Sequence, residues 1–172
     1  NGIADYNTLA VLFAENAPKY DPADVPAMPA ATPAKGSAKE MDWWTSGISS
    51  KFAVGDVVTV TDVETGIAWQ EKRTGGTNHA DVQPVTAADT AAMKKACGSW
   101  SWERRAVWVS INGQKYAASM NCMPHGSGSI TTNNFSGHHC IHFTNSRTHG
   151  SDTVNSAHQK AIQKAYNWAR KN

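Results

Sequence analysis

Histidines gather around one cysteine in the second half of the chain. Of the seven histidines, six lie between His79 and His149, and three flank Cys140 in the segment SGHHCIH at residues 136–142. A thiolate is the reactive form of cysteine, and a neighbouring imidazole can lower its pKa, accept its proton or share a metal ion with it. The cluster therefore predicts either nucleophilic catalysis by Cys140 or a zinc site. Histidines that only form hydrogen bonds within the core are the third interpretation.

The zinc alternative draws on a second group of polar residues upstream. Wall-lytic zinc peptidases pair an early His and Asp with a later pair of histidines, and His79 and Asp81 resemble the early pair. On a strand, His139 and His142 would point to opposite faces, whereas the alternate residues of the segment 138–142 would share one face. The preferred mechanism needs no cofactor, and the alternative needs zinc. The candidate zinc ligands are His79, Asp81, His138, His139 and His142.

Composition restricts the classes of protein to which the chain can belong. With 172 residues it is long enough for one domain with a substantial core and a small appendage. Lys plus Arg exceed Asp plus Glu by only 16 to 14, which is not the basic pattern of a nucleic-acid-binding protein. No apolar run approaches the roughly 20 residues that span a bilayer, so we expect no membrane span in this chain.

The N-terminal part differs from the rest. Residues 1–14 have the pattern of a short helix, and five prolines between Pro18 and Pro33 predict an extended linker. We therefore expect an N-terminal helix and Pro/Ala-rich linker over residues 1–40 and a catalytic domain over residues 41–172. The chain begins at Asn1 without methionine, which suggests either an excised segment or a processed product from which a signal peptide or upstream domains were removed. Export is compatible with the second explanation.

Local patterns predict an α+β or mainly β fold. Alternation and turn residues favour one β-hairpin over residues 57–73 and a second around Asn112-Gly113. Thr86 can cap a helix over residues 87–96. A second helix would begin at Asp152 and bury an apolar face that consists of Val154, Ala157, Ala161, Ala165 and Trp168. Together these elements predict a mixed β-sheet with peripheral helices and a C-terminal amphipathic helix.

The three cysteines are too few for a disulfide scaffold. If Cys97 pairs with Cys122, Cys140 remains as a free thiol. Alternatively, all three are reduced, and the first two simply fill the core.

The order of residues around Cys140 is similar to that of L,D-transpeptidases of the YkuD type. In that family a strand ends in His-Gly, a variable loop follows, and a Ser/Thr-His-Gly-Cys motif continues through Ile-Arg to an Asn. Here His125-Gly126 precedes a Gly/Ser/Asn-rich loop and the segment GHHCIHFTN at residues 137–145. His139 and His142 stand where the family has Gly and Arg. The similarity spans about residues 52–146, and its most specific part is the last segment.

The resemblance implies cell-wall chemistry. Cys140 would attack a peptidoglycan stem peptide and form a thioester, His125 would be the activating histidine, and His138 would occupy the motif position. Ser127 or Asn145 would orient His125. The expected catalytic residues are Cys140, His125, His138 and His139, and the expected substrate-binding residues are Gly126, Arg147 and Asn145.

The expected partner is therefore the peptidoglycan stem peptide, and the expected location is secreted or cell-wall associated. Arg147 is expected to bind substrate because a guanidinium can hold a substrate carboxylate with two hydrogen bonds. A zinc-dependent peptidoglycan hydrolase is one alternative function. A non-catalytic wall-binding module is another, in which Trp43, Trp44, Trp100 and Trp102 stack on glycans.

Overall fold

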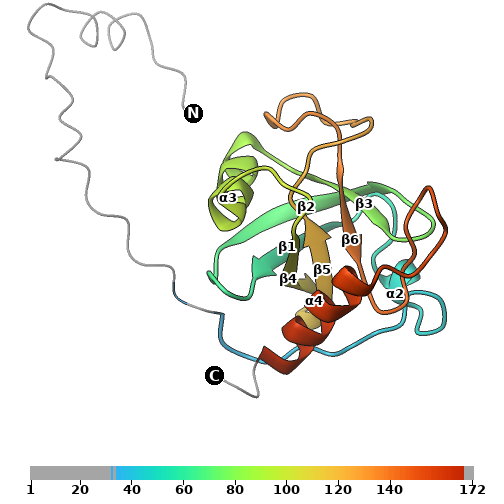
Figure 1. Cartoon of the computed structure of the whole chain (residues 1–172). Coiled ribbons are helices and arrows are strands. Elements are labelled where there is room, and N and C mark those ends of the chain that lie inside the picture. The colour runs from blue at the N-terminus through green and yellow to red at the C-terminus, as the bar shows by residue number, and fades with distance from the viewer. Residues whose placement is uncertain (1–31, 33, 169–172) are drawn as a thin grey trace, which may run out of the picture. The chain divides into compact units, whose positions relative to one another are not determined.

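The computed structural model describes residue 32 and residues 34–168, in which six strands close into a barrel with the order β1-β2-β3-β6-β5-β4 (Figure 1). Every pairing between these strands is antiparallel, and two isolated bridges outside them are parallel. The strands are β1 Val57–Asp62, β2 Ala68–Gly75, β3 Ala80–Pro84, β4 Arg104–Ile111, β5 Gln114–Asn121 and β6 His139–His142. The helices are α2 Ile48–Lys51, α3 Ala87–Cys97 and α4 Ser156–Asn167. The α+β fold class is confirmed, and closure of the sheet is an additional finding.

Both expected hairpins form, for reasons visible in the sequence. The β1–β2 turn is held by the Asp62 carboxylate, which accepts hydrogen bonds from the Thr65 backbone N–H and hydroxyl at 2.9 Å each. In the β4–β5 turn, Asn112 and Gly113 have φ values of 49° and 78°. Two successive positive φ values favour Asn-Gly, and they match the twist of the flanking strands.

Strand β3 was not expected, and it completes the barrel. It pairs with β2 on one side and with β6 on the other, where Asp81 lies opposite Cys140. A closed barrel leaves no unpaired strand edge. The pairing of β3 with β6 therefore depends on closure of the whole sheet and not on the residues near either strand. The register brings a carboxylate from one strand next to the thiol of another.

The two longer helices begin at side-chain caps. Helix α3 starts after Thr86, which forms a capping box with Asp89, as the sequence suggested. Helix α4 starts after Asn155 rather than at Asp152, because Asp152 has a φ of 48° and lies in the preceding loop. The buried face of α4 also differs from the expected one, since Val154 is 45% exposed. The buried residues of α4 are His158, Ala161, Ile162 and Ala165.

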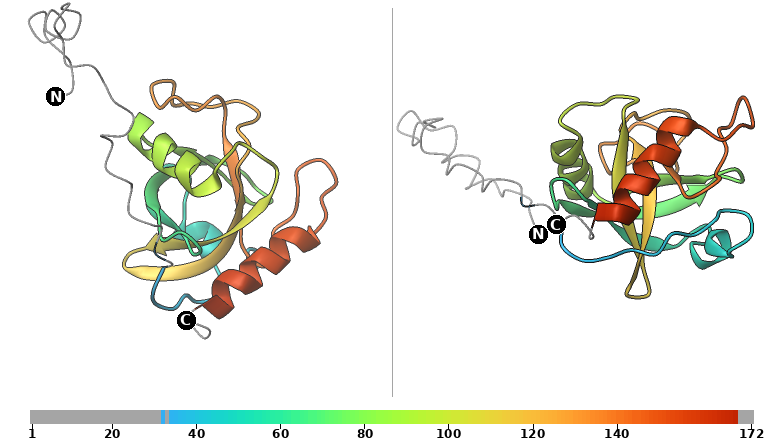
Figure 2. Two further views of the ribbon diagram at one scale, coloured as in Figure 1. Left: turned by 60° about the vertical axis from the view of Figure 1, so that its left-hand side comes forward. Right: turned by 60° about the horizontal axis from the view of Figure 1, so that its bottom comes forward.

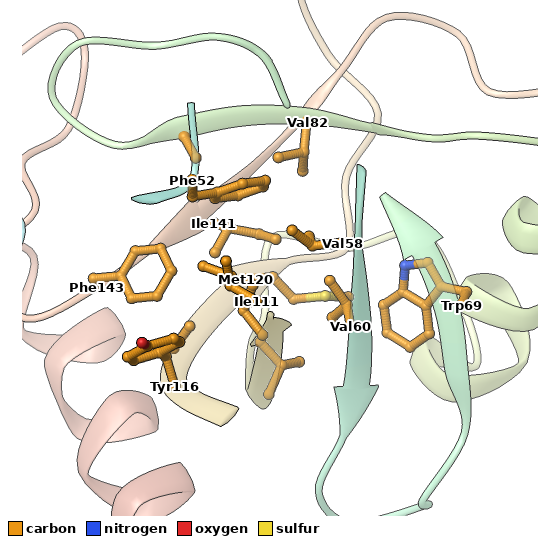
Figure 3. Packing of buried hydrophobic residues seen from close by; sticks show 14 of the residues in the cluster. Phe52, Val58, Val60, Trp69, Val82, Ile111, Tyr116, Met120, Ile141 and Phe143 are labelled. Atoms are coloured by element: carbon orange, nitrogen blue, oxygen red, sulfur yellow. The ribbon is translucent and has the colours of Figure 1, made fainter. Parts of the chain in front are cut away.

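Apolar side chains fill the barrel and also join α4 to its outside. Trp69, Met120 and Ile141 point into the interior (Figure 3). A second cluster packs α4 against β4 and β5, where the Trp108 indole N–H donates to the Ala165 carbonyl at 2.8 Å. Helices α3 and α4 cover different parts of the barrel (Figure 2). Because side chains alternate along a strand, the residues of β6 that face outward are Cys140 and His142.

The structure resolves the cysteine alternatives in favour of a disulfide. Cys97 and Cys122 are bonded, and Cys140 is a free, buried cysteine. The bond links the end of α3 to the residue after β5, three positions before His125. It therefore helps to fix the chain that carries His125.

The predicted N-terminal helix and most of the proline-rich linker lie outside the described residues. Residues 34–40 contact the barrel: the Ala34 N–H donates to the Val63 carbonyl, and the Lys39 N–H donates to the Lys115 carbonyl. Among the described residues, no helix combines the length and apolar character that crossing a bilayer requires.

Candidate active site

Cys140 lies at a pocket of about 240 Å³ on the outer face of the barrel. The residue is only 5% exposed, and it occupies the middle of β6. Trp102, Arg104 and Asn121 contribute to the pocket wall together with several histidines. The pocket histidines, all within the described chain, are His79, His125, His142, His149 and His158.

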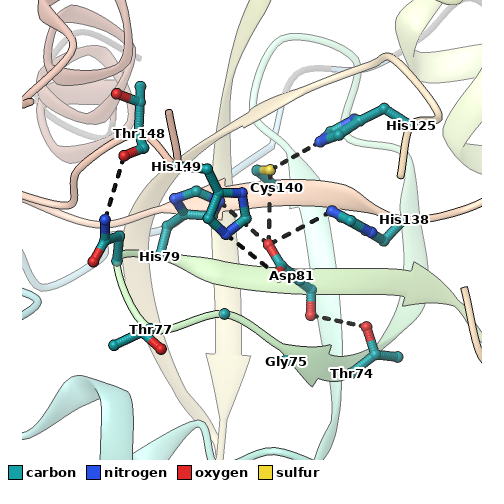
Figure 4. Close-up of polar contacts among 12 residues, drawn as sticks. Thr74, Gly75, Thr77, His79, Asp81, His125, His138, Cys140, Thr148 and His149 are labelled. Carbon is teal, nitrogen blue, oxygen red and sulfur yellow. Dashed lines mark hydrogen bonds and ion pairs between the residues drawn. The ribbon is translucent and has the colours of Figure 1, made fainter. Parts of the chain in front are cut away.

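His125 is the closest hydrogen-bonding partner of the Cys140 thiol. Figure 4 shows the contact of His125 with Cys140, in which its Nε2 lies 3.3 Å from Sγ. The His125 Nδ1 lies 2.7 Å from the Met123 carbonyl oxygen. Because a carbonyl only accepts, Nδ1 carries a proton and donates it, and Nε2 faces the sulfur. The group that orients His125 is thus a main-chain carbonyl two residues upstream, where the sequence had suggested Ser127 or Asn145.

His138 lies beside His125 on the same side of the thiol. The two residues exchange backbone hydrogen bonds of 2.8 Å, and their ring centroids are 4.6 Å apart. His138 Nδ1 donates to the Ser127 carbonyl at 2.7 Å. Gly126 has a φ of +61°, and a Cβ there would lie 2.5 Å from the His138 ring, so this position requires glycine to seat the imidazole.

A second row of histidines lies on the other side of Cys140. The rings of His79 and His142 stack at 4.3 Å, and the rings of His142 and His158 stack at 3.7 Å. His79 Nδ1 donates to the Arg147 carbonyl at 2.6 Å, and His158 Nδ1 lies 2.9 Å from the Ser119 hydroxyl. The sequence interpretation missed His158, because its place on α4 has the pattern of an ordinary core position.

Asp81 connects the two sides of the site. One of its carboxylate oxygens lies 3.2 Å from His79 Nε2, 3.7 Å from His138 Nε2 and 3.9 Å from Cys140 Sγ. The other carboxylate oxygen lies 3.7 Å from His149 Nε2. Figure 4 shows Asp81 between the histidines on the two sides of the thiol. Asp81 was expected only as a zinc ligand, and in the structure its carboxylate is the contact that His79, His138 and His149 share.

These contacts change the protonation of the site. Burial alone would raise the pKa of Cys140, but the surrounding histidines, His125 first among them, hold it well below its usual range. The neighbouring thiolate raises the pKa of His125 and raises that of His138 to about 9. Burial opposes charge on His79, yet Asp81 and the thiolate raise its pKa to about 10. At neutral pH the arrangement favours a thiolate surrounded by imidazolium groups.

Two other histidines of the site remain neutral. Burial lowers the pKa of His142, and it lowers that of His158 to about 2. The charges of nearby histidines and of Arg104 add to this effect. The stacked pair His142–His158 therefore forms an uncharged part of the pocket wall, next to the charged thiolate and imidazolium groups.

His139 is placed away from the site. It points into the barrel interior, is 0% exposed, and its Nε2 lies 2.9 Å from the Glu71 carboxylate. Cys140 and His142 face the opposite side of β6, in keeping with the alternation of a strand. The structure therefore does not bring His139 to Cys140, whether as a catalytic residue or as a metal ligand.

Two of the expected substrate-binding residues also lie elsewhere. The Asn145 side chain donates to Asp42 at 2.6 Å, and its carbonyl accepts from the Trp44 indole. The Arg147 guanidinium lies over the Trp44 ring and 3.4 Å from Asp152. Neither residue lines the Cys140 pocket. Both hold the loops around it.

The four tryptophans expected in a glycan-binding surface differ in exposure. Trp43 is 2% exposed and belongs to the core, and Trp100 packs against that core. Trp44 and Trp102 are exposed. Only Trp102 lines the Cys140 pocket, with its ring 4.8 Å from that of His125.

Three overlapping groups in the described chain could hold a metal ion. Within each group the ligand atoms lie within 4.8 Å of one another, and the residue types match zinc's preference for nitrogen, sulfur and carboxylate oxygen. His142 Nδ1 is buried without a hydrogen-bond partner, which suits a ligand. His138 and His142 fall in different groups. The groups are His79–Cys140–His142, His125–His138–Cys140 and His79–Asp81–His149.

Comparison of the chain with protein-family models, curated proteins and solved structures gives no match. The similarity to L,D-transpeptidases therefore remains a prediction from the residues around Cys140.

Proposed function

We propose that the chain is a cysteine acyltransferase that acts on peptidoglycan stem peptides, in the manner of L,D-transpeptidases. The observation that carries this proposal is the pairing of Cys140 Sγ with His125 Nε2 at 3.3 Å, with His125 fixed through Nδ1 by the Met123 carbonyl. A nucleophile, a base and a group that orients the base are the three parts of an activated thiol.

The first half of the reaction forms a thioester. The Cys140 thiolate attacks the carbonyl carbon of an L,D peptide bond, and a C–S bond forms as the carbonyl oxygen gains negative charge. The C–N bond then breaks, and the leaving amine takes the proton from His125 Nε2. His138, whose pKa is raised to about 9, supplies positive charge beside the sulfur while the oxyanion exists.

The second half releases the acyl group. An amine or a water molecule enters, His125 Nε2 accepts its proton, and the nucleophile attacks the thioester carbonyl. The C–S bond breaks, and the thiolate returns to the stabilising contact with its histidines. The Cys97–Cys122 disulfide supports a location outside the cytoplasm, because structural disulfides persist in oxidising compartments.

The experiment that tests this function is trapping of the acyl-enzyme. The purified chain is incubated with a synthetic stem peptide that contains an L,D bond, quenched in acid and analysed by intact-mass and peptide-mass spectrometry. We expect an adduct on Cys140 that is absent in Cys140→Ser and strongly reduced in His125→Ala. Turnover of the peptide by Cys140→Ser at the wild-type rate would exclude the thioester mechanism.

A zinc-dependent peptidoglycan hydrolase is the second candidate, and the group His79–Asp81–His149 favours it. This group contains two imidazoles and a carboxylate and does not require the thiol. Bound zinc would supply an activated water molecule, and the three residues would hold it. Elemental analysis combined with chelation separates the candidates. Stoichiometric zinc with chelator-sensitive cleavage that survives Cys140→Ser supports the hydrolase, whereas chelator-insensitive acylation supports the cysteine mechanism.

A further inference from the structure

Arg104 is an arginine of the Cys140 pocket that has no carboxylate partner among the described residues. It lies at the start of β4 and lines the same pocket as Cys140 and His125. One guanidinium nitrogen donates to the Trp102 carbonyl, and the buried Nε has no hydrogen-bond partner. A guanidinium retains its charge at any ordinary pH, so an unpartnered donor of this kind can receive an anion.

The next residue provides a natural contrast. Arg105 points to the other side of β4 and donates to both oxygens of the Asp62 carboxylate, at 2.6 Å and 3.0 Å. Glu64 lies 3.6 Å from the same guanidinium. The two adjacent arginines thus differ in their partners. Arg105 forms ion pairs with carboxylates of its own chain, whereas Arg104 faces a pocket.

The groups that face Arg104 across the pocket are mostly cationic or neutral. No carboxylate lines this pocket within the described chain, and its titratable lining consists of histidines, the arginine and the thiol. The charge of Arg104 also acts on His142 and His158, which places it close to the stacked pair. The Asp81 carboxylate contacts histidines of the site, and its oxygens are already shared among three of them. The pocket therefore has excess positive charge on the side of Arg104.

We propose that Arg104, with Trp102 as the apolar wall beside it, forms a subsite that binds a carboxylate of the substrate next to the carbonyl that Cys140 attacks. A bidentate guanidinium–carboxylate contact fixes the orientation of the substrate as well as its affinity. The exposed Trp102 ring packs against His125 and can cover the aliphatic part of the bound residue. The identity of the peptide rests on the proposed function, but the recognition of a carboxylate does not.

A pair of alkylating probes tests the subsite without reference to any natural substrate. Iodoacetate transfers a carboxymethyl group to the Cys140 thiolate, and iodoacetamide transfers a carbamoylmethyl group. In both reactions an S–C bond forms as the C–I bond breaks and iodide leaves, and the two reagents are similar in size but differ in charge. We expect Arg104→Gln to lower the ratio of the iodoacetate rate to the iodoacetamide rate by roughly tenfold, because one charge-assisted contact is lost. Arg104→Lys retains the charge and should lose less of the ratio.

Arg105→Gln is the matched control, since it removes the same charge from the neighbouring position. Arg105→Gln should leave the ratio of the two alkylation rates unchanged. Thermal unfolding separately measures the stability that this variant loses when the Arg105–Asp62 ion pair is removed. An equal ratio in the wild type and in folded Arg104→Gln overturns the subsite, as does an equal decrease in Arg104→Gln and Arg105→Gln.

A second measurement connects the subsite to the proposed function. Acylation of Cys140 is compared for a stem peptide with a free C-terminal carboxylate and for the same peptide as its amide. The wild type should prefer the acid by roughly ten- to a hundredfold, and Arg104→Gln should lose this preference through its rate on the acid alone. Failure of every stem peptide together with an Arg104-dependent alkylation ratio would overturn the proposed function and leave the carboxylate subsite standing.

Discussion

Two histidine–carboxylate arrangements lie on opposite faces of strand β6 and differ in almost everything except their residue types. Inside the barrel, His139 and Glu71 are both 0% exposed and contact each other at 2.9 Å. Outside it, His138 and His79 share Asp81 and surround the Cys140 thiol at a pocket. His138 and His139 are neighbours in sequence, so the face of the strand decides which histidine meets the thiol.

The difference between the two arrangements shows what separates a histidine with a catalytic role from one with a structural role. The inner pair satisfies buried donors, because Glu71 also accepts from the Trp69 indole at 2.5 Å. The outer group has a free thiol, a cavity and more imidazoles than carboxylates, so the thiolate becomes the anion that balances the imidazolium charges. We therefore expect substitutions on the inner face to reduce stability and substitutions on the outer face to reduce activity.

The largest expected effect is on the outer face. His125→Ala should lower acylation of Cys140 by about 10²- to 10⁴-fold, because the imidazolium that stabilises the thiolate and protonates the leaving amine is lost. The melting temperature should change little, since His125 is partly exposed and its ring does not belong to the core. His139→Gln is the inner-face counterpart and should retain its rate per folded molecule. Steady-state rates and thermal unfolding of both variants measure this contrast, and equal losses of rate would contradict it.

Breaking the inner pair should have the opposite result. Glu71→Ala leaves the buried His139 and Trp69 donors without an acceptor and should lower the free energy of unfolding by about 3–5 kcal/mol. Asp81→Ala, at a site that is 15% exposed, should destabilise less and reduce acylation more. Urea denaturation and acylation rates of the two variants provide the comparison. A Glu71→Ala protein with native stability would refute the structural role of the inner pair.

Acid sensitivity should arise from His158. Burial lowers its pKa to about 2, below the unfolded value of about 6.5, so between these values only the unfolded state binds the proton. The contribution of His158 is complete above about pH 6.5 and is lost on acidification, by up to about 1.4 kcal/mol per pH unit. His158→Gln should therefore show a shallower decrease in unfolding free energy between about pH 7 and pH 5. Parallel decreases in both proteins would exclude this assignment.

The smallest expected effect is at Arg147. Its guanidinium is half-exposed, pairs with Asp152 and lies over Trp44, so Arg147→Gln should alter stability by less than about 1 kcal/mol. Its acylation rate and its acid-to-amide preference should match the wild type, in contrast to Arg104→Gln. A loss of the preference in Arg147→Gln would return the substrate carboxylate to the residue that the sequence had favoured.

Local signals predicted much of the fold. The Asn112-Gly113 turn, the Thr86 cap and the β-branched run of β1 each depend on a few neighbouring residues, and the structure has the turn, the cap and the strand. Strand β3 and closure of the barrel depend on pairing between β3 and β6, for which no local pattern exists. The start of α4 was misplaced because Asp152 is as good a capping residue by type as Asn155.

The candidate site follows the same division. The cluster in sequence pointed to Cys140, and the resemblance pointed to His125 and His138, which the structure places around the thiol. Arg104 on β4 and His158 on α4 are far apart in the sequence and reach the Cys140 pocket only because the fold brings these two elements together. Residue types alone could therefore not place Arg104 and His158 at the site. The list of expected zinc ligands joined both faces of β6, because a sequence does not show which alternate residues point outward.

The pH dependence of Cys140 alkylation by iodoacetamide tests the central claim most directly. An ordinary thiol reacts about tenfold faster for each pH unit until its pKa near 8.5, whereas a thiolate held by His125 and its neighbours reacts at a constant rate through the neutral range. We predict a flat profile from about pH 6 to pH 9 in the wild type and a lower rate at neutral pH in His125→Ala. A rate that rises through the neutral range with an apparent pKa of about 8.5 or above would contradict the account.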